Sequence, residues 1–155
     1  MSYDQEQLLA SVFRLGEGYF GIPAAQIQEV VQPGTLTPVH HAPPWVSGIR
    51  NLRGRIVTVI DLKAKLGLGS LESGASNRIL MVDSGGELLG LLVEGVEDTI
   101  FIDPGSVSHD SPEVDGIDSR FLRGIYPFEN RLLALLDHDA VLRSDGKAAA
   151  RDLAS

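Results

Sequence analysis

The chain has 155 residues, 43% of them hydrophobic and 22% charged, a balance that excludes disorder over most of its length. Its formal net charge of −8 disfavours nucleic acid or an anionic membrane as the main partner, and the lack of cysteine excludes disulfides and thiolate metal sites. The polar, acidic start and the lack of any run of about 18 apolar residues predict a cytoplasmic protein that reaches a membrane only through a partner.

Short apolar segments separated by Gly and Pro turns run through the first half of the chain. The predicted strands are 8–15, 19–23, a segment that starts at Ile27 after a short turn at 24–26, and a central strand over 51–62 that opens with a polar turn. Residues 42–48 begin with prolines and end with glycine, which predicts a short capping helix. One further helical turn is expected directly after the central strand.

The second half repeats this plan after a Ser/Gly-rich stretch at 69–77, which is the best linker in the chain. The predicted elements are strands 79–83, 88–93, 96–102, 121–126 and 131–136, a long loop over 103–118, and a helical turn over 137–143. Residues 1–9 and 143–155 are expected to be flexible termini.

The two halves also resemble each other in sequence. Gly21 corresponds to Gly90 (90 − 21 = 69) and Gly48 to Gly116 (116 − 48 = 68), so the offset is nearly constant. An ancestral unit used twice explains this better than chance similarity between β segments. The sequence therefore predicts a mainly β domain over 10–142, built as two tandem five-stranded barrels at about 10–70 and 78–142, with short capping helices.

The titratable residues do not form a convincing catalytic or metal site. His40 and His41 are adjacent, so in an extended chain they point to opposite faces. Asp61 and Asp137 each follow a predicted strand, where N-capping of the next helical turn is the expected role. The acidic loop from Asp103 to Asp118 lacks the spacing of a calcium-binding loop, and the motifs of phosphate-binding loops, nucleophile elbows and zinc proteases are missing. We expect no enzymatic activity, cofactor or metal.

Four segments together resemble the CheW-like family of chemosensory coupling adaptors. They are Phe20-Gly21-Ile22, Ile27-Gln28-Glu29-Val30, the stretch from Gly48 through Asn51-Leu52-Arg53-Gly54 to Leu62, and the stretch from Gly90 to Val96. This resemblance implies two five-stranded SH3-like barrels without catalytic activity, in a scaffold of two-component signal transduction that serves chemotaxis or a related output. It implies three partners: the regulatory domain of a CheA-type histidine kinase, the cytoplasmic tip of a methyl-accepting chemoreceptor, and other CheW-like proteins.

The resemblance also assigns partner-binding residues. Ile27 would contact the receptor helix, Glu29 and Arg53 would form a charge pair across neighbouring strands, and Gly48 would permit close backbone approach beside the turn that contains Gly54. The alternatives for Glu29 and Arg53 are an exposed strand residue and a solvated turn residue. A different hypothesis for the whole protein is a small-ligand or nucleotide-binding regulator that uses the cleft between the barrels, based on the Gly-rich turns and on the arginines at 50, 53 and 55.

Overall fold

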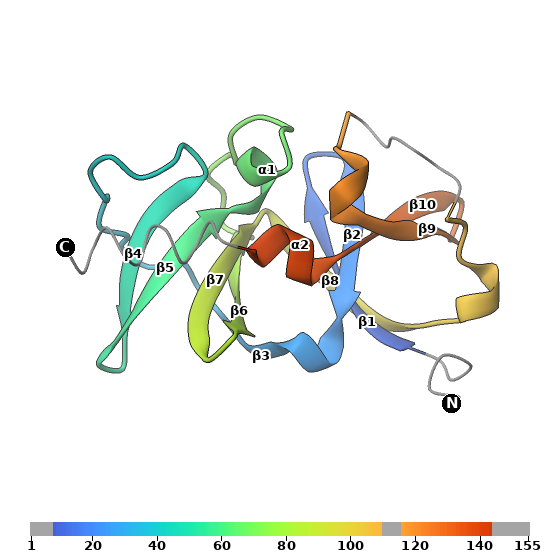
Figure 1. Ribbon diagram of the computed structural model, residues 1–155, viewed down its shortest axis with the longest axis horizontal. Helices are drawn as coiled ribbons and strands as arrows, with labels where there is room; N and C mark the ends of the chain where they lie inside the picture. The colour runs from blue at the N-terminus through green and yellow to red at the C-terminus, as the bar shows by residue number, and fades with distance from the viewer. Residues whose placement is uncertain (1–7, 110–115, 144–155) are drawn as a thin grey trace.

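A computed structural model describes residues 8–109 and 116–143, and within these ranges the chain forms ten strands in two five-stranded sheets (Figure 1). The strands are β1 (Leu8–Leu15), β2 (Gly18–Pro23), β3 (Ile27–Val31), β4 (Val46–Leu52), β5 (Arg55–Asp61), β6 (Arg78–Ser84), β7 (Glu87–Val93), β8 (Gly95–Ile102), β9 (Leu122–Phe128) and β10 (Arg131–Leu136). The helical elements are η2 (Ala24–Gln26), α1 (Leu62–Lys65), η3 (Pro104–Ser106), η4 (Ser119–Phe121) and α2 (His138–Leu142).

The two sheets have the same strand order when the halves of the chain are superposed in sequence. We call the sheet β3-β6-β7-β5-β4 barrel I and the sheet β8-β1-β2-β10-β9 barrel II. Replacing β1–β5 by β6–β10, and the reverse, converts one order into the other. The parallel pair β5–β7 of barrel I likewise corresponds to the parallel pair β10–β2 of barrel II. The predicted mainly β fold with five strands per half and short helices is therefore confirmed.

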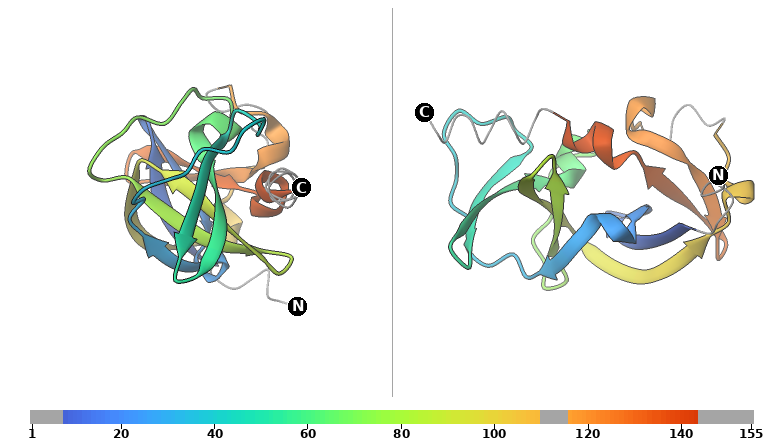
Figure 2. Two further views of the ribbon diagram at one scale, coloured as in Figure 1. Left: turned by 90° about the vertical axis from the view of Figure 1, so that its left-hand side faces the viewer. Right: turned by 60° about the horizontal axis from the view of Figure 1, so that its bottom comes forward.

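The predicted division into subdomains at 10–70 and 78–142 does not match the two sheets. The hairpin β1–β2 of the first half joins barrel II, and the hairpin β6–β7 of the second half joins barrel I. The stretch at 69–77 is irregular as predicted, yet it connects two strands of the same barrel. Each half thus contributes a hairpin to the other barrel, which the parallel pairs require, since parallel neighbours need a long connection. Figure 2 shows the resulting two lobes with α2 between them.

Strand pairing also corrects the alignment of the two halves. Gly21 and Gly90 are indeed equivalent, since each lies opposite the matching residue of its hairpin. Gly48, however, is equivalent to Gly124 and not to Gly116, because both open the pairing of their strand next to an isolated bridge from a preceding loop. The connection from β8 to β9 is longer than that from β3 to β4, which a constant offset cannot reproduce.

Two predicted elements in the first half are wrong. Residues 42–48 form a turn followed by β4, and no helix, because Val46 donates its backbone N–H to the carbonyl of Pro43 and its strand pairs with β5. The central strand over 51–62 is interrupted by the Arg53-Gly54 turn, which separates β4 from β5. The predicted flexible termini fall largely outside the described residues, but Leu8 and Leu9 belong to β1.

Apolar runs in the strands are explained by burial on both faces. In β6, Ile79 and Met81 face a cluster inside barrel I, whereas Leu80 and Val82 face a larger cluster between the two barrels. Barrel II has a corresponding small cluster that includes Leu133. The central cluster draws residues from both sheets, so the barrels share one core and hold each other in place.

Both short α-helices are capped as the sequence predicted. The carboxylate of Asp61 accepts a hydrogen bond from the backbone N–H of Ala64 at 3.0 Å, and that of Asp137 accepts one from Ala140 at 3.2 Å. Such caps satisfy orphan N–H groups of the first helical turn. The duplicated aspartates are therefore structural positions of the repeat.

Candidate functional site

An exposed ion pair connects the two edges of barrel I. The Arg53 guanidinium donates to Oε1 of Glu29, with 66% of the Arg53 side chain and 39% of the Glu29 side chain exposed. Glu29 lies on β3 and Arg53 follows β4, and these are the two edge strands of the sheet. The predicted charge pair is present, but it bridges opposite edges of the sheet and not neighbouring strands.

The turn that carries Arg53 has an unusual backbone. Arg53 and Gly54 have φ angles of 51° and 85°, as a two-residue hairpin turn with positive φ at both positions requires. The Asn51 side chain supports this turn by accepting the N–H of Gly54 at 3.0 Å. A non-glycine residue in this region costs about 1–2 kcal/mol, so an asparagine or glycine would suit the turn better than Arg53. Retention of arginine there points to a role for its side chain.

Gly48 marks the closest backbone approach beside this surface. A Cβ atom at Gly48 would lie 2.6 Å from the carbonyl oxygen of Thr37, and its φ is 149°. The reason is an antiparallel bridge between Thr37 and Ile49, in which each N–H donates to the other carbonyl. The loop after β3 thereby closes onto β4, which holds the two edges of barrel I together near the Glu29–Arg53 pair.

Ile27 begins β3 and is half-buried against the central core, so only part of its side chain is available to a partner. Val30, two positions from a bulge in the same strand, is 44% exposed. The five predicted site residues thus lie on one barrel, with Glu29 and Arg53 in contact. Ile27 and Gly48 contribute mainly to the framework beneath this surface.

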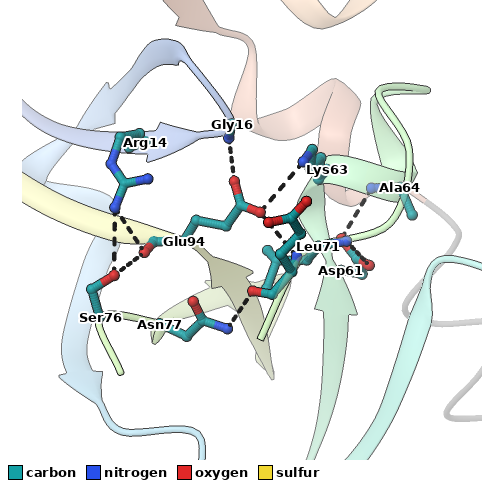
Figure 3. A network of polar contacts seen from close by, with 10 residues as sticks. Arg14, Gly16, Asp61, Lys63, Ala64, Leu71, Ser76, Asn77 and Glu94 are labelled. Atoms are coloured by element: carbon teal, nitrogen blue, oxygen red, sulfur yellow. Dashed lines mark hydrogen bonds and ion pairs between the residues drawn. The ribbon is translucent and has the colours of Figure 1, made fainter. Parts of the chain in front are cut away.

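A buried carboxylate pins the junction of the two barrels (Figure 3). Glu94 lies between β7 of barrel I and β8 of barrel II, and its side chain is 8% exposed. Its carboxylate accepts the N–H of Gly16, the N–H of Glu72 at 2.9 Å and the Lys63 ammonium at 3.4 Å. Burial raises the pKa of Glu94, but these two backbone donors and the Lys63 charge outweigh burial, so the pKa falls below its usual value.

The Glu94 backbone carbonyl is also fully used. It accepts hydrogen bonds from Ser76 Oγ at 2.7 Å and from the Arg14 guanidinium at 3.3 Å. Donors to this one residue therefore come from the β1–β2 hairpin, from α1 and from the stretch at 69–77 (Figure 3). Glu94 acts as a structural joint, and nothing in its surroundings resembles a catalytic acid.

The acidic loop does not provide a metal site in the described residues. Asp103 caps η3 by accepting the N–H of Gly105 at 3.1 Å, and Asp118 caps η4 by accepting the N–H of Arg120 at 3.0 Å. Across residues 8–109 and 116–143 there is no cluster of three or more His, Asp or Glu side chains able to hold a metal. The remaining acidic residues of this loop lie outside the described residues.

The arginines proposed for a nucleotide cleft are placed elsewhere. Arg50 donates to the carbonyl of Pro33 at 2.8 Å, and Arg53 is paired with Glu29. Neither they nor Arg55 line the pocket found between the barrels. In the part of the chain that the structure describes, no helix combines the length and apolar character needed to cross a membrane.

Two interleaved barrels that share a core and expose a rigid charged edge define a protein of the double-barrel scaffold class. Comparison with known proteins agrees: a family described as "CheW-like domain" matches residues 10–146, and this chain therefore belongs to the CheW-like domain family. The chemotaxis protein CheW of Rhizobium meliloti is 28% identical over 138 residues, which cover 89% of each chain. That of Klebsiella aerogenes is 25% identical, covering 92% of this chain and 86% of the relative.

A solved structure also matches closely. The scaffolding protein TtCheW from Thermoanaerobacter tengcongensis superposes with a TM-score of 0.82 and 30% sequence identity, covering 91% of both chains. The resemblance that the four sequence segments indicated is confirmed. Sequence reasoning missed the joint at Glu94, which it treated only as part of a motif. An odd buried glutamate at the crossing between two apolar strands was the available signal.

Proposed function

We propose that this protein is a non-enzymatic adaptor that couples chemoreceptors to a CheA-type histidine kinase. Membership of the CheW-like family supports this proposal, and the exposed Glu29–Arg53 pair on a rigid double-barrel scaffold is the observation that carries it. An adaptor needs preformed surfaces and no convergent catalytic groups, and the described residues fit that need. The protein would act in the cytoplasm, next to the membrane only through its receptor.

The receptor surface in this proposal is the edge of barrel I. Glu29 and Arg53 offer both signs of charge in a fixed geometry, and Val30 adds an exposed apolar contact beside them. Such a combination suits a helix that presents apolar and charged side chains at helical spacing. Gly48 and Gly54 would act indirectly, by holding the loop and the turn in place.

Co-sedimentation with receptor-containing membranes and the kinase tests the proposal. The Arg53→Glu variant places two carboxylates at the edge and should weaken receptor binding at least tenfold. The combined Glu29→Arg and Arg53→Glu variant restores opposite charges and should recover part of the binding. Arg55→Glu is the matched control, because Arg55 is exposed on the same hairpin outside the pair.

The kinase arm of the same experiment separates the two partners. A purified regulatory domain of the kinase should bind wild type and Arg53→Glu alike if the edge of barrel I serves the receptor. Failure of wild type to bind both partners would refute the adaptor function. Equal losses for Arg53→Glu and Arg55→Glu would refute the specific role of the ion pair.

A further inference from the structure

A pocket of about 350 Å³ lies where the two barrels meet, and the proposed function does not use it. Its walls include the rings of Trp45 and Phe121, the cationic side chains of Lys65, Arg120 and Arg143, and the carboxylate of Asp137. The pocket lies beside α2, which lies over the junction of the two lobes (Figure 1). Its volume is in the range of small-molecule sites, about 300–1,000 Å³.

The two aromatic walls are equivalent positions of the repeat. The backbone carbonyl of Trp45 accepts the N–H of Asp61 at 2.6 Å, and that of Phe121 accepts the N–H of Asp137 at 2.8 Å. The internal symmetry therefore brings one ring from each half to the same pocket. Lys65 Nζ lies 4.6 Å from the centre of the Trp45 ring and 5.9 Å from that of Phe121. Both distances are within the range of cation–π contacts.

Positive charge dominates the pocket. Three cationic side chains line it together with one carboxylate, and that carboxylate already accepts the N–H of Ala140 as a helix cap. Burial, followed by the charge of Arg120, lowers the pKa of Lys65 to about 8. A local positive potential of this kind is unusual on a chain of net charge −8. An anion in the pocket would offset it.

The pocket wall also includes a donor that lacks an acceptor. The indole Nε1 of Trp45 is buried and has no hydrogen-bond partner in the part of the chain that the structure describes. An unsatisfied buried N–H costs about 1–3 kcal/mol, so an acceptor brought by a ligand would relieve this cost. Arg120 stacks on Phe121, with its guanidinium carbon 4.7 Å from the ring centre, and leaves its donors at the mouth of the pocket.

We propose that this pocket binds a carboxylate carried on a compact apolar or aromatic group. The Trp45 and Phe121 rings would hold the apolar part, and the cationic side chains with the Trp45 N–H would hold the carboxylate. The carboxylate has two possible sources, a free organic acid or an acidic side chain of a partner protein. This site is separate from the Glu29–Arg53 edge, which belongs to barrel I alone.

Isothermal titration of the full chain tests the proposal with three probes. Phenylacetate represents a free acid, acetyl-Phe-Glu-amide represents an acidic side chain beside an aromatic one, and phenylacetamide is the neutral match of the first. At least one carboxylate should bind at least fivefold more tightly than phenylacetamide. Binding of phenylacetate assigns a free acid, and binding of the peptide alone assigns a partner side chain.

Variants locate the binding. Lys65→Gln, Arg143→Gln and Trp45→Phe should each weaken the bound probe at least threefold, whereas Arg55→Gln removes a cation outside the pocket and should leave it unchanged. Trp45→Phe keeps the aromatic wall and removes only the N–H, so it remains informative if larger changes unfold the protein. In NMR titrations of wild type, the pKa of Lys65 should rise when the probe is bound. Absence of carboxylate binding, or equal binding by all variants, would overturn the proposal.

Discussion

The two barrels have the same strand order and bulges at matching places, yet their edges carry different charges. Strand pairing makes Asp98 of barrel II equivalent to Glu29 of barrel I, and Glu129 equivalent to Arg53. Both turns have positive φ at two positions, with Glu129-Asn130 in place of Arg53-Gly54. Barrel I therefore closes its edges with an ion pair, whereas barrel II places two acidic residues at the same positions.

Positions inside the fold show the opposite behaviour. Gly48 and Gly124 each lie against the bridging loop of their own barrel, and Asp61 and Asp137 each cap a helix. The repeat has kept the residues whose replacement would disturb closure or capping. It has changed the exposed ones, where a charge reversal costs little stability, since exposed ion pairs contribute only about 0–1 kcal/mol. Differences between the barrels therefore indicate binding surfaces.

Alanine at the two equivalent glycines should have the largest effect. At Gly48 the new Cβ meets the Thr37 carbonyl oxygen at 2.6 Å with a φ of 149°, so Gly48→Ala should lower the free energy of unfolding by about 3 kcal/mol. At Gly124 the nearest atom is Cγ1 of Val107 at 2.4 Å, a side chain that can shift. Gly124→Ala should therefore cost less, about 1–2 kcal/mol.

Urea unfolding monitored by circular dichroism measures both values. Gly54→Ala is a useful control, because its φ is 85° but a Cβ there meets nothing within 4 Å, so only backbone strain of about 1 kcal/mol is expected. A Gly124→Ala variant as damaged as Gly48→Ala would show that closure of the two barrels is equally rigid.

Glu94 breaks the symmetry at the crossings between the barrels. By strand pairing its counterpart is Ala25 of η2, which is exposed and makes no such network. Glu94→Gln keeps the shape but leaves Lys63 without its charge partner, and should lower the free energy of unfolding by about 2–3 kcal/mol at pH 7. Chemical unfolding measures this loss, and Ala25→Gln should be close to neutral.

The contribution of Glu94 also depends on pH. Its pKa is lowered in the folded protein, so the unfolded chain binds the proton more readily. The stabilisation is therefore complete above the unfolded pKa, near about 4.3, and is lost as the pH falls towards the folded pKa. The stabilities of wild type and Glu94→Gln should converge as the pH is lowered from 6 to 3. A constant difference over this range would mean that the carboxylate charge is unimportant.

The smallest effect is expected from giving barrel II the ion pair of barrel I. Glu129→Arg places a cation at the turn opposite Asp98 and should raise the free energy of unfolding by about 0.2–1 kcal/mol at low salt. The gain should shrink in 0.5 M salt, because exposed charges are screened. Thermal unfolding at both salt concentrations checks this, with Glu129→Gln separating removal of the acid from formation of a pair. No difference between the two variants would show that the edges of barrel II do not meet.

Much of the fold could be predicted because short-range rules governed it. Alternating and continuous apolar runs gave the strands, and glycine or asparagine turns gave most of the hairpins. The helix predicted at 42–48 failed because Val46 and the following residues gain a full ladder with β5, which outweighs the local preference of Pro43 and Pro44 for a first helical turn.

The sequence by itself determined the repeat, the strand content, the helix-capping aspartates and the Glu29–Arg53 pair, because these depend on residue type and close spacing. Only the tertiary structure decided that the halves exchange hairpins, that Gly48 matches Gly124, and that Trp45 and Phe121 meet at one pocket. These features depend on which distant strands pair, and the pairing is selected by burial of both strand faces in a shared core, a property of the whole chain rather than of any segment.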